Sequence, residues 1–108
     1  MRCKILYSPQ ALKDMDEIWD YIGSELRSPV SAEKTVAHIM EQVDMLADFP
    51  EMGTPLSLMV DYDTDFRYLV CGNYMAFYEF SGDMVMVSRI LYGRRDFLRI
   101  LRGENDEQ

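Results

Sequence analysis

The stretch from Phe66 to Tyr92, FRYLVCGNYMAFYEFSGDMVMVSRILY, decides the fold. It contains three runs that are rich in aromatic and β-branched residues, and the short gaps between them contain Gly72 and Gly82. This pattern is typical of consecutive antiparallel strands joined by tight turns. The sequence therefore predicts a three-strand meander, with strands over 66–71, 74–80 and 84–92.

Alternation within the last of these strands predicts which side chains share a face. Side chains two residues apart point to the same side of a strand. One face is then formed by Val85, Val87, Arg89 and Leu91. The opposite face is formed by Met84, Met86, Ser88, Ile90 and Tyr92.

Two Ser-Pro pairs, Ser8-Pro9 and Ser28-Pro29, mark the starts of two helices upstream of the meander. Serine caps a helix well, and proline suits the first helical position. The first helix is predicted over 9–26, because apolar residues recur there at three- and four-residue steps. Its stripe consists of Leu12, Met15, Trp19, Ile22 and Leu26, with Ile18 beside it. Trp19 is expected in the core, and Asp14, Asp16, Glu17 and Asp20 are interpreted as a solvated face.

The second helix is predicted to extend to Phe49, since Pro50 cannot continue it. Only a few residues separate the two helices, so they are expected to form an antiparallel hairpin. Residues 2–7 precede the hairpin and alternate like a strand. Residues 50–65 have no clear period and are expected to form a loop, with a short strand or turn around 58–60. A short helix is expected over 94–101.

These elements together predict an α+β fold. An N-terminal strand and an antiparallel helical hairpin pack on a mainly antiparallel sheet, which ends in the three-strand meander. A chain of 108 residues, 48% of them hydrophobic, is sufficient for one domain with its own core. We expect that domain to span 1–102 and the acidic tail 103–108 to be disordered.

Composition excludes several classes of protein. No apolar run approaches the roughly 20 residues of a membrane helix, and the N-terminus lacks the apolar region of a signal peptide. Two cysteines and one histidine make a zinc site implausible, and few cysteines favour a reduced, cytoplasmic protein. No phosphate-binding glycine loop or dinucleotide motif is present, so no cofactor or metal is expected.

Charge is divided unevenly along the chain, whose net charge is −8. Residues 67–102 contain six arginines and three acidic residues, and carry a local charge of +3. Guanidinium groups bind phosphate oxygens in a forked geometry. The candidate catalytic residues are therefore four of these arginines, Arg67, Arg89, Arg94 and Arg95. Tyr92 is added because it lies beside them at the end of the last predicted strand. From the residues alone, this interpretation and one of ordinary surface or paired arginines are equally good.

The chain resembles the RelE/ParE toxin superfamily of bacterial type II toxin–antitoxin systems along nearly its whole length. The resemblance lies in seven segments. They are Ile5–Leu12, Ile18–Ile22, Leu46–Gly53, Phe66–Val70, Gly72–Tyr74, Phe77–Tyr78 and Arg89–Asp96, the last reading RILYGRRD. It implies a small cytoplasmic toxin that inhibits growth, and an antitoxin that binds it through an extended, largely helical segment in a hetero-oligomer. RelE-like members cut messenger RNA on the ribosome without a metal ion, whereas ParE-like members poison DNA gyrase.

The resemblance also implies roles for single positions. Arg95 aligns with a family arginine that acts on phosphate, and Tyr92 stands where many relatives have histidine. Met75 occupies a place where RelE-like nucleases carry another arginine, and Leu101 lies near their C-terminal aromatic residue. The set of nuclease residues is thus incomplete, and the run from Arg89 to Asp96 is closer to ParE-like members. The remaining alternative is a degenerate, non-catalytic module that only binds the antitoxin.

Overall fold

The structure is a computed structural model that describes residues 2–61 and 63–93. The main elements are β1 (Lys4–Tyr7), α1 (Pro9–Asp20), α2 (Pro29–Asp44), β2 (Thr54–Pro55), β3 (Arg67–Cys71), β4 (Tyr74–Ser81) and β5 (Met84–Tyr92). Three short helical turns connect them: η1 (Tyr21–Glu25), η2 (Met45–Ala47) and η3 (Leu56–Leu58). The predicted order of elements is confirmed through β5. The predicted helix over 94–101 and the tail 103–108 lie outside the described residues.

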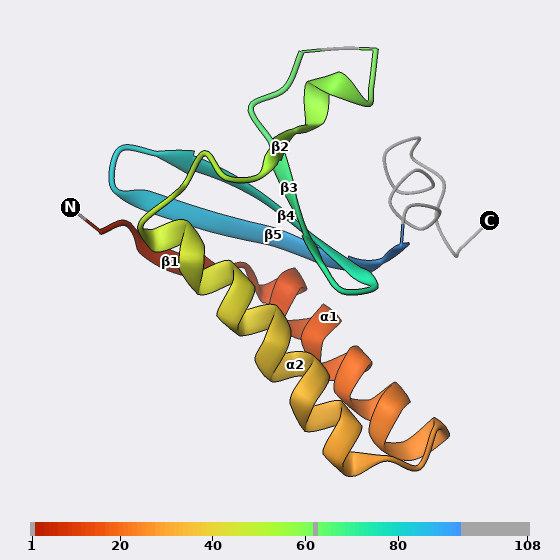
Figure 1. Cartoon of the computed structure of the whole chain (residues 1–108). Helices are drawn as coiled ribbons and strands as arrows, with labels where there is room; N and C mark the ends of the chain where they lie inside the picture. The colour runs from red at the N-terminus through yellow and green to blue at the C-terminus, as the bar shows by residue number, and fades with distance from the viewer. Residues whose placement is uncertain (1, 62, 94–108) are drawn as a thin grey trace.

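The five strands form one sheet in the order β1-β5-β4-β3-β2. β1 pairs with β5 in parallel, and every other neighbouring pair is antiparallel. Figure 1 shows the sheet as the middle layer, with α1 and α2 on one side and η3 on the other. The predicted α+β architecture, with a helical hairpin on a mainly antiparallel sheet, is confirmed.

Both serines cap their helices as predicted. The Ser8 hydroxyl accepts a hydrogen bond from the Ala11 amide at 3.0 Å, and the Ser28 hydroxyl accepts one from Ser31 at 3.4 Å. The first helix is α-helical only to Asp20 and continues as the π-helical turn η1. Gly23 lies inside this turn, where its low helix propensity weakens the regular ladder. The helical extent was therefore predicted well, but the change of helix type was not.

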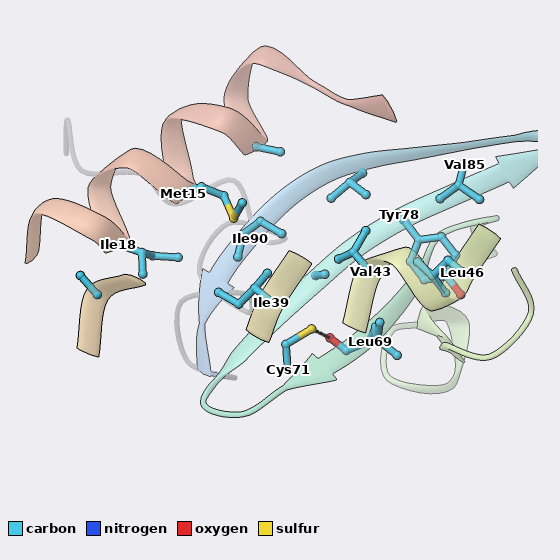
Figure 2. Close-up of a cluster of buried hydrophobic side chains, with 14 of the residues drawn as sticks. Met15, Ile18, Ile39, Val43, Leu46, Leu69, Cys71, Tyr78, Val85 and Ile90 are labelled. Atoms are coloured by element: carbon cyan, nitrogen blue, oxygen red, sulfur yellow. Dashed lines mark hydrogen bonds between the residues drawn. The ribbon is translucent and has the colours of Figure 1, made fainter. Parts of the chain in front are cut away.

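The main core fills the space between the hairpin and the sheet. Figure 2 shows side chains of α1, α2 and the strands directed toward one another, with the fully buried Tyr78 among them. A smaller apolar cluster lies on the opposite face of the sheet, under η3. It contains Leu56, Met75, Phe77 and Leu91.

A β-bulge makes the prediction about the faces of β5 wrong. Phe77 pairs with Arg89 while Tyr78 pairs with Val87, so Ser88 is an extra residue on β5. An extra residue reverses the alternation beyond it. Ile90 therefore joins Val85 and Val87 in the main core, whereas Leu91 lies in the smaller cluster.

The predicted apolar stripe on α1 is also only partly confirmed. Met15, Ile18 and Ile22 are buried as expected. Leu12 and Trp19 remain 52% and 43% exposed, so the expectation that Trp19 belongs to the core is wrong. The buried line instead follows Ala11, Asp14, Met15 and Ile18.

The segment 50–65 crosses the far face of the sheet. It contains β2, which pairs with β3, followed directly by η3. The turn expected around 58–60 is present at the end of η3, where the Met59 amide donates to the Leu56 carbonyl at 2.8 Å. Leu56 anchors η3 because its side chain is buried in the smaller cluster. Within the described ranges, no helix has the length and apolar character needed to cross a membrane.

Candidate functional site

The end of β5 is the first part of the candidate site, and α1 holds it in place. β1 ends at Tyr7, opposite Val87, while β5 continues to Tyr92. Ser8 then bridges to β5, because its amide donates to the Val87 carbonyl at 2.9 Å and its hydroxyl donates to the Ser88 carbonyl at 2.9 Å. The helix therefore covers the strand edge that β1 no longer pairs.

Asp14 on α1 also pairs with the free edge of β5, and it binds Arg89. Its Oδ2 accepts hydrogen bonds from the Ile90 amide and from Arg89 Nε, both at 2.9 Å. Its Oδ1 accepts a further bond from Arg89 Nη2 at 3.1 Å. The carboxylate is 5% exposed, and the pairing with Arg89 is bidentate, the strong form of this interaction. Asp14 was interpreted as part of a solvated face, and that interpretation is wrong.

A signal for Asp14 was present in the sequence. Asp14 lies three residues after Ala11 and four before Ile18, which are the steps of a buried helix line. An acidic residue on such a line implies a buried partner, since a lone buried carboxylate is costly. Arg89 is the residue that meets it.

Arg67 lies at the start of β3 and is held by backbone oxygens. Its Nη1 donates to the Glu51 carbonyl at 3.2 Å and to the Gly53 carbonyl at 2.8 Å. Its guanidinium carbon lies 5.8 Å from the centroid of the Phe80 ring, within the range of a cation–π contact. The guanidinium group is thereby tied to the turn that precedes β2.

The same turn is fixed by Tyr78. Its hydroxyl donates to the Pro50 carbonyl at 2.7 Å and accepts from the Gly53 amide at 2.9 Å. Burial raises the pKa of Tyr78, while the bond from Gly53 and the nearby Arg67 oppose this rise. Gly53 is required here, because a Cβ at this position would lie 2.5 Å from the Tyr78 hydroxyl.

Beside Arg67 there is a cavity of about 230 Å³. It is lined by Pro55, Thr64, Asp65, Phe66, Arg67 and Phe80. The lining contains one acidic side chain, Asp65, and one basic side chain, Arg67, so the cavity offers no excess positive charge to an anionic ligand.

Tyr92 lies at the opposite end of the sheet. It is 60% exposed, and its ring meets the Tyr74 ring edge-on, with centroids 5.3 Å apart and planes inclined by 71°. Burial raises the pKa of Tyr74, and the neighbouring Tyr92 and Tyr21 raise it further. The Gly93 amide donates to the Asn73 carbonyl at 3.0 Å, which closes this end of the sheet.

The structure does not bring the three described candidates together. Arg67 pairs across the sheet with Tyr78, whereas Tyr92 pairs with Tyr74, opposite the far end of β3. Four residues of strand separate these ends, a span of about 13 Å. Arg89 lies between them and is turned to Asp14. Arg94 and Arg95 lie outside the described residues.

The other positions with possible chemistry have structural surroundings. Met75 is buried in the smaller cluster, so this place on β4 is apolar. Burial raises the pKa of Cys71 to about 11, which keeps its thiol protonated. Across residues 2–61 and 63–93, no group of three or more His, Cys, Asp or Glu side chains is arranged to hold a metal ion.

Comparisons with known proteins place this geometry in a family. Residues 5–97 match the family model for the ParE toxin of the type II toxin–antitoxin system parDE. Among solved structures, a chain from the chromosomal ParDE system of P. aeruginosa has a TM-score of 0.70 and 23% identity, and the match covers 86% of this chain and 98% of that one. That likeness supports the fold. No curated protein matches.

Proposed function

The chain belongs to the ParE toxin family of type II toxin–antitoxin systems, and we propose that it acts in the cytoplasm by poisoning DNA gyrase until a cognate antitoxin neutralises it. The family match over residues 5–97 carries this proposal. The arrangement of the described arginines supports gyrase over messenger RNA as the target.

Metal-independent RNA cleavage requires several groups around one phosphate. A base accepts the proton of the attacking 2′-hydroxyl, cations stabilise the charge that develops, and an acid protonates the leaving oxygen. Cations serve this purpose when they converge on the phosphate and remain free to bind it. The guanidinium of Arg89 is instead taken by the Asp14 carboxylate, and that of Arg67 by two carbonyl groups.

The net charge supports the same choice. Ribosomal RNA is a dense polyanion, and a protein of charge −8 is repelled from it at long range. An acidic toxin is therefore better matched to a protein target.

Ribosome-dependent messenger RNA cleavage remains the second candidate, because Tyr92 is exposed at the end of β5 and only Gly93 separates it in the sequence from Arg94 and Arg95. Its test is the variant Arg95→Ala. If Arg95 stabilises the phosphate in the transition state, its loss lowers cleavage by about 100- to 1,000-fold. Lys34→Ala, an exposed cation on α2, is the matched control.

The deciding experiment is inducible expression in bacteria without antitoxin, in which growth, DNA breaks and cuts in messenger RNA are measured, together with a supercoiling assay on purified gyrase. Gyrase poisoning predicts growth arrest, accumulated double-strand breaks and loss of supercoiling by purified gyrase, with messages intact. New cuts in translated messages, mapped by primer extension, would instead establish the nuclease. Normal growth with folded protein present would contradict both activities and favour a module that only binds the antitoxin.

A further inference from the structure

The paired parts of β1 and β5 are apolar on both faces, although the helices cover only one of them. Seven of the eight residues in 4–7 and 84–87 are hydrophobic. Strands buried on both faces have such continuous apolar runs, whereas strands with one solvated face alternate apolar and polar residues. The face toward the helices packs in or against the main core through Ile5, Tyr7, Val85 and Val87. The residues between them therefore point to the other side of the sheet.

On that other side, six side chains of β1, β5 and β4 form two rows. The register places Lys4, Met84 and Ser81 side by side in one row, and Leu6, Met86 and Glu79 in the next. Met84 is 42% exposed, and every member of the two rows keeps contact with solvent. None of the six belongs to the smaller apolar cluster under η3. We call this surface the β1–β5 patch.

The two charges of the β1–β5 patch lie at its diagonal corners. Lys4 ends one row on β1, Glu79 ends the other row on β4, and the two methionines lie between them on β5. Strand spacing places the Cα atoms of Lys4 and Glu79 about 12 Å apart. Both side chains are exposed, and neither forms an ion pair within residues 2–61 and 63–93. The patch thus presents one free cation and one free anion on either side of an apolar centre.

Charge favours a second copy of the chain on this surface. When two patches face each other, a twofold axis across the diagonal brings Lys4 of each copy opposite Glu79 of the other. Both pairs form together, because a twofold interface uses the same surface on both copies. The helical side of the chain does not allow this, since residues 9–49 contain three basic and nine acidic side chains, a net charge of −6. Two copies that met through their helices would oppose like charges.

From these features we infer that the β1–β5 patch is a contact surface between two copies of the chain, packed face to face across a twofold axis. Leu6, Met84 and Met86 form the apolar centre, where the flexible methionine side chains adapt to each other. The two pairs between Lys4 and Glu79 close its ends. Six residues are few beside the roughly 20–30 on each side of a standard interface, so the dimer is weak, with a Kd on the order of 10 µM or above. The inference goes beyond the proposed function and does not depend on it.

Sedimentation equilibrium of the purified full chain from about 1 to 300 µM tests the association. The average mass should rise with concentration from that of one chain toward that of two. Met84→Lys is expected to raise the Kd at least tenfold, because it buries a charge in the apolar centre. Val30→Lys is the matched control, since Val30 is 65% exposed at the start of α2 and the substitution changes the net charge equally; it should change the Kd less than threefold. Melting temperatures show that each variant is folded.

Exchange of the two corner charges tests the twofold arrangement. Lys4→Glu makes both facing corners acidic and Glu79→Lys makes both basic, so each variant alone should associate at least tenfold more weakly in low salt. An equimolar mixture of the two variants should recover the wild-type Kd, because one copy then has two acidic corners and the other has two basic corners. The exposed pair Glu33 and Lys34 on α2 supplies the control. Lys34→Glu and Glu33→Lys should each associate like the wild type, alone or mixed.

The outcomes separate this inference from the proposed function. A wild-type chain that stays monomeric at the highest concentration would overturn the inference and leave the proposed function intact. Single corner variants that associate as well as the wild type would overturn the patch, and a mixture that does not recover would overturn the twofold arrangement. A monomeric chain whose Met84→Lys variant binds antitoxin more weakly would assign the patch to that partner and also overturn the inference. A wild-type dimer that does not inhibit gyrase would contradict the proposed function alone.

Discussion

Replacing Asp14 by alanine should destabilise the protein more than any change at a neighbouring acidic residue. The carboxylate accepts four hydrogen bonds, two from Arg89, one from the Ile90 amide and one from Gln10 Nε2, and is 5% exposed. Breaking a buried ion pair on one side usually costs about 3–5 kcal/mol, because it leaves the other charge buried and unpaired. The Arg89 side chain is 30% exposed, so water recovers part of this loss, and we expect about 3 kcal/mol.

Urea denaturation measures this difference, with the fluorescence of Trp19 and the far-ultraviolet circular dichroism as two independent signals. A domain of this size is stable by about 5–15 kcal/mol, so a loss of this size moves the midpoint clearly. Asp16→Ala is the control, since Asp16 is exposed and its loss should stay within about 0.5 kcal/mol. A free energy of unfolding for Asp14→Ala within about 1 kcal/mol of the wild type would refute the reasoning.

A double-mutant cycle with Arg89→Met isolates the pair itself. Removing Asp14 also costs the bond from the Ile90 amide, whereas removing Arg89 does not. We therefore expect Asp14→Ala to be the more harmful single change and the coupling energy between the two sites to be about 2 kcal/mol. Additive effects of the two substitutions would contradict a direct interaction between the side chains.

Further predictions concern the turn before β2 and the buried hydroxyl and thiol groups. Tyr78→Phe should lower the free energy of unfolding by about 2 kcal/mol, because it removes the partner of the buried Gly53 amide and of the partly buried Pro50 carbonyl. Gly53→Ala should cost more because of its clash with the Tyr78 ring; both are measured by urea denaturation. Tyr7→Phe should leave stability unchanged or raise it by about 1 kcal/mol, since the Tyr7 hydroxyl is buried without a hydrogen-bond partner among the described residues; a loss above about 1 kcal/mol would contradict this. Burial raises the pKa of Tyr7 from 10 to about 12 in the folded state, so ionisation of this hydroxyl does not destabilise the fold below pH 10 and does so increasingly as the pH rises toward about 12. A pH series should therefore show a shallower alkaline decline in stability for Tyr7→Phe, which has no hydroxyl to ionise. Cys3 should react with a thiol reagent before Cys71, which is buried and has a pKa of about 11; equal labelling rates in native protein would contradict its placement in the core.

Most of the fold could be predicted because its determinants are local. Ser8 and Ser28 cap their helices through their own side chains, and the turns that follow β3 and β4 use Gly72 and Gly82 at φ values of +65° and +60°. Such positive values suit glycine, which lacks a Cβ. Each of these features depends on residues that are adjacent in the sequence.

The two wrong assignments on β5 and α1 have non-local causes. The bulge at Ser88 depends on how β5 aligns with β4, which alternation within β5 alone does not reveal. Helical spacing on α1 is satisfied equally by the line through Leu12 and Trp19 and by the line through Ala11 and Ile18. Which line is buried depends on where the sheet and α2 lie, and this is a property of the tertiary structure.

The arrangement of the candidate site could not be predicted for the same reason, because it also depends on contacts between residues far apart in the sequence. Sequence placed Arg67, Arg89 and Tyr92 correctly on strands, but a strand position does not tell what binds the side chain. The partners of Arg67 are backbone carbonyls 14 and 16 residues away, and the partner of Arg89 is 75 residues away on α1. A count of arginines in a segment therefore overstates the charge that is free to bind a ligand.

The difference in length between β1 and β5 connects these observations. Because β1 stops at Tyr7, the strand edge beyond Val87 needs another partner, and α1 supplies it through Ser8 and Asp14. Asp14 must then face the sheet, which fixes the rotation of α1 and turns Leu12 and Trp19 outward along the junction with α2. The buried ion pair and the exposure of Leu12 and Trp19 are thus two consequences of one helix orientation. Changes at Asp14 should therefore alter stability and the end of β5 together.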